Sequence, residues 1–149
     1  MKQTFDTDAI IFGILKGSTA LNAAITGGVY AQQRPLNSEK EDVVVNTITL
    51  SQDSFPQFGT SNINIHVADK TVTIGGVQQR VQDRERLKAI AGIVLAEIRA
   101  AKVKGLTMLV ETQSTLQEAA INQHFVNIRI SWNIHNYLYQ QRRWCTPSV

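Results

Sequence analysis

The chain has 149 residues, of which 43% are hydrophobic and 18% charged, with a formal net charge of +3. This apolar share excludes wholesale disorder, and one cysteine excludes an internal disulfide or a multi-cysteine metal site. No stretch of about 18 apolar residues exists, so no transmembrane helix is expected. The first residues lack an apolar leader and a small-residue cleavage pattern, so we expect the chain to fold in a cytoplasm. The length favours one domain, here residues 1–139, followed by a tail at 140–149.

The first half of the chain predicts two helical segments and three strands. Helical spacing of Ile10, Ile11, Ile14 and Leu15 indicates helix over 7–25, with an interruption near Gly17. Further along, we expect strands at 29–34, 43–50 and 62–67, separated by a polar loop at 35–42 and a turn or loop at 54–61. In the third strand, Ile63, Ile65 and Val67 share the predicted buried face, and Asn62, Asn64 and His66 face away.

The second half predicts the longest helix and the longest strands. Residues 68–79 form a connection in which 71–74 is either a small strand or a loop that orders on contact. An apolar stripe from Leu87 to Ile98 indicates a helix over 80–102, ended by Gly105. Strands over 106–119 and 125–136, joined through 113–124, suggest an extended hairpin. The order predicts an α+β fold, with two main helices packed on an antiparallel or mixed β-sheet and a long C-terminal β-hairpin.

Positive charge is concentrated between Arg80 and Lys104, where seven basic residues accompany three acidic ones. Such a segment is typical of a solvated helix face of mixed sign. It also fits a nucleic-acid-binding module that uses the basic helix 80–104, or a helix that binds an acidic protein surface.

The sequence predicts no catalytic, cofactor-binding or metal site. Cys145 lies in a polar tail without an activating neighbour. His66, His124 and His135 lack the four-residue spacing that places two metal ligands on one helix face. We therefore expect a non-enzymatic protein. The alternative is a small enzyme or ligand-binding domain with a deep pocket, whose site the sequence does not reveal.

The segment Ala20-Leu21-Asn22-Ala23-Ala24-Ile25-Thr26-Gly27-Gly28-Val29-Tyr30 resembles the start of bacteriophage tail terminator (tail completion) proteins. A proline-containing polar stretch and a β-branched strand follow it, and the resemblance covers about residues 8–100. It implies a virion protein of the phage neck, assembled in the host bacterial cytoplasm. The subunit would form a ring, often a hexamer, that caps the tail tube and faces the head connector.

That resemblance implies that function lies in interfaces. The expected partners are copies of the same chain, other neck and tail-tube proteins, and genomic DNA that passes through the lumen without sequence-specific contact. No membrane is involved. The candidate interface residues lie in the loops 52–61 and 68–79, in the 113–124 turn and on the basic helix: Phe55, Phe58, Thr71, Val72, Ile74, Gln117, Gln123, Arg84, Arg86 and Lys88. The helix residues would face outward or contact an acidic neighbour.

Overall fold

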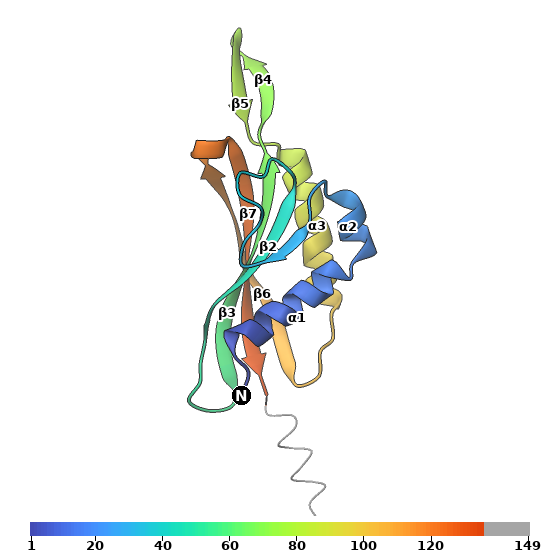
Figure 1. Ribbon diagram of the computed structural model, residues 1–149, viewed down its shortest axis with the longest axis vertical. Coiled ribbons are helices and arrows are strands. Elements are labelled where there is room, and N and C mark those ends of the chain that lie inside the picture. The colour runs from blue at the N-terminus through green and yellow to red at the C-terminus, as the bar shows by residue number, and fades with distance from the viewer. Residues whose placement is uncertain (136–149) are drawn as a thin grey trace, which may run out of the picture.

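The computed structural model describes residues 1–135 (Figure 1). In chain order the elements are α1 (Thr4–Lys16), α2 (Thr19–Ala24), β1 (Val29–Ala31), β2 (Asp42–Leu50), β3 (Gln57–Ala68), β4 (Lys70–Ile74), β5 (Val77–Val81), α3 (Arg84–Ala100), β6 (Leu106–Glu118), the 3-10 turn η1 (Ala119–Ile121) and β7 (Gln123–Ile134). The predicted tail at 140–149 and Cys145 lie outside the described residues.

Five strands form one mixed sheet in the order β1-β2-β3-β7-β6. Strands β1 and β2 are parallel, and every other neighbouring pair is antiparallel. Strands β6 and β7 form the long C-terminal hairpin, joined by η1 and by Asn122 in the left-handed conformation. The predicted α+β class, with helices packed on a mixed sheet and a C-terminal hairpin, is therefore confirmed.

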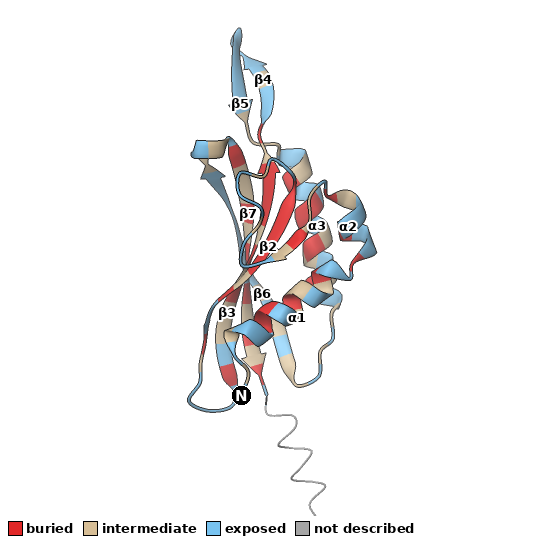
Figure 2. Cartoon of the chain, viewed as in Figure 1, coloured by how far each residue is buried: buried red, intermediate tan, exposed pale blue. Residues whose placement is uncertain are grey.

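All three helices lie against the same face of the sheet, and the core fills the layer between them (Figures 1 and 2). The alternation of β3 and β7 supplies the sheet side of this core, because successive side chains of a strand point to opposite faces. The buried sheet residues include Ile63, Ile65, Val67, Val126, Ile128, Ile130, Trp132 and Ile134. Each fully buried aliphatic side chain contributes roughly 1.5–3 kcal/mol relative to an exposed one.

The helices follow from their caps and apolar stripes. Ser18 caps α2 by accepting a hydrogen bond from Leu21 N, and Gly17 separates α2 from α1, as predicted. Helix α3 buries Leu87, Ile90, Ala91, Val94 and Ile98. The predicted helix 80–102 was too long at both ends. Asp83 caps α3 by accepting from Arg86 N, so the residues before it are free to form β5.

A row of hydrogen-bonded, buried hydroxyl groups links α1 to the sheet. Thr7 Oγ1 lies 2.7 Å from Thr47 Oγ1 of β2, which lies 2.7 Å from Ser61 Oγ of β3. Trp132 Nε1 of β7 donates to the same Ser61 Oγ at 2.7 Å, and Thr7 Oγ1 donates to Thr4 O at 2.8 Å. Four elements thus share one satisfied polar path inside an apolar core, where an unpaired hydroxyl would be costly.

Strands β4 and β5 pair only with each other and form a two-stranded hairpin that projects beyond the end of the main sheet (Figure 1). Its turn is Gly75-Gly76, and both glycines have positive φ (56° and 78°), as a two-residue hairpin turn requires. Of the two alternatives for residues 71–74, the strand is correct. The hairpin also extends through Val81, which sequence reasoning assigned to the helix.

Candidate interaction surfaces

Within residues 1–135 no cluster of three or more metal-ligating side chains is present, and no helix is long and apolar enough to cross a membrane. The nearest approach to catalytic geometry is His124, whose Nδ1 lies 2.6 Å from Asp69 Oδ1. No hydroxyl or thiol of the described residues is hydrogen-bonded to His124. Beside this pair, Asp69 N donates to Asn122 O, which ties the root of the β4–β5 hairpin to the β6–β7 turn.

One end of the sheet face opposite the helices is covered by the loop between β1 and β2. Arg34 of this loop donates to Asp42 Oδ2 at 3.2 Å and to the side-chain oxygen of Gln123. Gln123 Nε2 donates in turn to Ser38 O at 2.6 Å. Gln123 is 1% exposed, so its predicted interface role would require this loop to move.

His66 lies under the same loop. It faces away from the apolar core, as predicted, yet it is buried against Phe125, with ring centroids 5.1 Å apart. Burial, and to a smaller extent the Arg34 charge, lower the pKa of His66 to about 4, with Asp42 opposing the shift. His66 is therefore neutral at pH 7, although its Nδ1 lies 3.1 Å from Glu118 Oε1.

Arg86 links helix α3 to Glu41 before β2 and to the end of α2, so its side chain is only partly available to a partner. Its Nε donates to Glu41 Oε2 at 2.8 Å, and its terminal nitrogen donates to Glu41 Oε1 at 2.7 Å and to Ala24 O at 2.6 Å. The hydrogen bond and charge of Glu41 raise the pKa of Arg86. The neighbouring candidates Arg84 and Lys88 are exposed.

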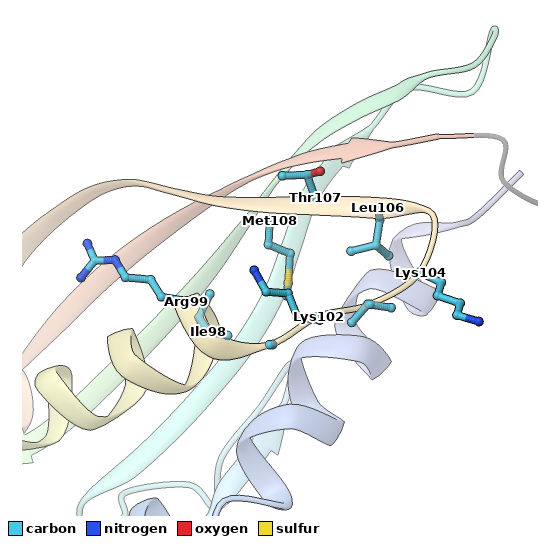
Figure 3. Close-up of a pocket in the computed structure, with 9 residues that line it drawn as sticks. Ile98, Arg99, Lys102, Lys104, Leu106, Thr107 and Met108 are labelled. Atoms are coloured by element: carbon cyan, nitrogen blue, oxygen red, sulfur yellow. The ribbon is translucent and has the colours of Figure 1, made fainter.

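Three other basic residues of the segment, Arg99, Lys102 and Lys104, lie at a groove at the other end of α3 (Figure 3). A cavity of about 460 Å³ lies between the end of this helix and β6, lined by Ile98, Arg99, Ala101, Lys102, Val103, Lys104, Leu106, Thr107 and Met108. Arg99 and Lys104 extend away from it at opposite ends. Helix α3 has 17 residues, so at 1.5 Å per residue its two basic ends lie about 25 Å apart. The predicted basic helix is thus two separate clusters.

The hairpin β4–β5 carries three of the candidates. Thr71 and Ile74 are exposed, and Val72 is half-buried. At the tip, Ile74 is 52% exposed and Val77 is 59% exposed. No residue from 70 to 80 is buried, so the structure presents a free arm with an apolar tip (Figure 2). We refer to residues 70–81 as the arm.

Strand β6 is the longer of the two edge strands of the sheet, β1 being the other, and it carries Gln117, which is exposed. Leu109 and Leu116 of this strand are also exposed, at 63% and 45%. The sequence pattern does not single out either leucine, because one apolar side chain in a polar strand gives no signal until the strand is known to be an edge. We refer to residues 106–118 as the edge.

Phe55 lies in the loop before β3, and Phe58 is the second residue of that strand. This loop is at the end of the molecule that holds the N-terminus (Figure 1). Phe55 is 36% exposed and Phe58 is 57% exposed. The predicted loop 52–61 is shorter in the structure, because β3 begins at Gln57. These two residues are therefore separated from the arm by the length of the sheet.

No protein-family model matches the sequence, and no curated protein gives a significant match. The fold does occur among solved structures. One such chain belongs to a structure described as the virion of native gene transfer agent (GTA) particle. It superimposes with a TM-score of 0.61 at 12% identity, over 85% of this chain and 92% of that chain. At this identity the likeness shows a shared fold.

Proposed function

We propose that this chain is a structural protein of a phage-like virion, and that it forms a ring at the neck like the tail terminator proteins it resembles. The observation that carries the proposal is the fold match to a chain of the GTA virion, which spans nearly the whole of both chains. The resemblance of residues 20–30 to tail terminators points independently to the same kind of particle.

The exposed features fit this function better than a catalytic one. An arm with an apolar tip, an open sheet edge and two exposed phenylalanines are surfaces that bind protein. The partners would be further copies of the chain, in a ring with the stoichiometry of a hexamer, and the neck and tail-tube proteins on either side. Genomic DNA would pass through the lumen without sequence-specific contact.

The test is the solution mass of the full chain over a range of concentrations, with negative-stain images of any large species. Rings with a central hole, or tubes stacked from rings, are the expected result. A chain that stays monomeric at every concentration would contradict ring formation by the chain alone.

The groove beside Arg99, Lys102 and Lys104 favours a second candidate, a nucleic-acid-binding module. Its prediction is DNA affinity that falls steeply with salt, because phosphate contacts release counterions. Reversal of these three charges would abolish that binding, whereas reversal of Arg84 and Lys88 at the far end of α3 would leave it largely intact. Salt-independent or undetectable binding would exclude this candidate.

A further inference from the structure

Among residues 1–135 the arm has little support beyond its root, where Arg80 donates to Asp69 O at 3.3 Å. A two-stranded hairpin in water is marginally stable at best, and it needs a third strand or a packed face. Within residues 1–135 the arm has neither, because its strands pair only with each other and none of residues 70–80 is buried. Ile74 and Val77 are cross-strand neighbours at the turn, yet within residues 1–135 nothing else covers them, and both stay more than half exposed.

The edge lacks a neighbouring strand on its outer side. It is 13 residues long, and its outer side pairs with no strand among residues 1–135. The exposed stretch from Thr112 to Gln117 follows the bulge at Glu111 and contains no charge or proline, which are two of the usual devices that protect a free edge. With Leu116 exposed within this stretch and Leu109 exposed before it, the strand is suited to receive another β-strand.

Charge and length match between these two surfaces. The arm contains Lys70 and Arg80 and no acidic residue, whereas the edge contains Glu111 and Glu118 and no basic residue. Neither cation of the arm forms an ion pair within the described residues. The five-residue strands of the arm span about 17 Å, which the seven residues from Thr112 to Glu118 can accommodate.

We propose that the arm of one copy docks along the edge of a second copy, with its basic root, where Lys70 and Arg80 lie together, against Glu111 and its apolar tip against Leu116. The two surfaces are different parts of the chain, so the contact is head-to-tail and repeats from copy to copy. Such a contact closes into a ring when the rotation per copy allows it. The inference rests on the proposed ring and specifies which surfaces build it.

The experiment exchanges the charges of the two surfaces in the full chain. The arm variant is Lys70→Glu with Arg80→Glu, and the edge variant is Glu111→Lys with Glu118→Lys. Each reversal places like charges across the contact, so each is expected to weaken self-association by about tenfold or more. The chain with all four changes restores opposite charges and is expected to regain the wild-type mass in light scattering and sedimentation.

Mixing the two variants gives a second measurement that does not depend on the fourfold chain. The arm of each variant is then opposite in charge to the edge of the other, so the mixture is expected to assemble although neither variant does alone. Because Glu118 also contacts His66, Glu111→Lys alone serves as the milder edge change. The control is Lys16→Glu with Lys40→Glu, which alters the net charge as the arm variant does, at exposed residues outside both surfaces.

The outcomes separate this contact from the ring itself. If the wild type assembles and the single reversals do not weaken it, or neither combination restores it, the contact is overturned and the ring proposal stands. If the control variant weakens assembly as strongly, net charge is the cause and the contact is likewise overturned. If the wild type stays monomeric throughout, both the contact and ring formation by the chain alone fail.

Discussion

Protonation of His66 is expected to destabilise the folded chain below neutral pH. The unfolded chain binds a proton at this imidazole as the pH falls below about 6.5, whereas the folded chain resists until the pH reaches about 4. Because the unfolded state holds more protons in this interval, the contribution of His66 to stability is complete above pH 6.5 and is lost as the pH falls towards 4.

The size of the effect follows from the two pKa values. Between pH 7 and pH 4.5, a pKa of about 4 in the folded state and 6.5 in the unfolded state corresponds to a loss of about 2 kcal/mol. The main cause is burial, to which the Arg34 charge adds and which Asp42 opposes. Glu118 lies close to the ring, but its side chain is 33% exposed, so water screens its attraction for a protonated His66.

The assay is urea unfolding followed by far-UV circular dichroism at pH 7 and pH 4.5. His66→Gln stays neutral at both values, so this variant is expected to lose about 2 kcal/mol less than the wild type across the interval. His135→Gln, which changes an exposed histidine, is the matched control and should follow the wild type. Equal losses for His66→Gln and the wild type would show that the folded chain accommodates the imidazolium, and the reasoning would be refuted.

Three further substitutions test the packing. Trp132→Phe removes the N–H that donates to Ser61 Oγ and is expected to cost about 2–3 kcal/mol in urea unfolding; no loss would mean that the buried bond contributes nothing. Gly27→Ala places a Cβ 1.9 Å from Asp42 Oδ1 and is expected to destabilise by about 2 kcal/mol or more. Gly92→Ala meets no atom within 4 Å inside α3, so it is expected to raise stability by about 1 kcal/mol. Thermal unfolding of the two glycine variants should shift in opposite directions, and a shift of the same sign would contradict the backbone environments described for them.

The elements that sequence reasoning predicted best are those with a sustained period. Helix α3 repeats its apolar residues at helical spacing, and β7 alternates from Val126 to Ile134, so local pattern and tertiary burial agree. The arm was harder to predict. Its strands have no buried face of their own, so only Gly75-Gly76 indicated a hairpin, and a loop remained an equal alternative.

Several residues have surroundings that could not be predicted from the sequence, because their partners lie far away along the chain. Arg86 pairs with Glu41, which lies 45 residues away, and Gln123 meets Arg34 across 89 residues. His66 is buried because the same loop covers the outer face of the sheet at that end. Local spacing contains no information about such pairs, so the burial of Gln123 and His66 on the outer face could not be predicted from the sequence pattern.

The buried hydroxyls that join α1 to the sheet have only one proton arrangement. The indole N–H of Trp132 donates to Ser61 Oγ, and the hydroxyl of Thr7 donates to the carbonyl oxygen of Thr4. With both ends fixed, Ser61 must donate to Thr47 and Thr47 to Thr7, so every proton points from the sheet towards the helix. Rotation of α1 by one residue, about 100°, would break the sequence of donors at Thr7 and leave a hydroxyl unpaired in the core. The hydroxyl network therefore allows only one rotational orientation of the first helix on the sheet.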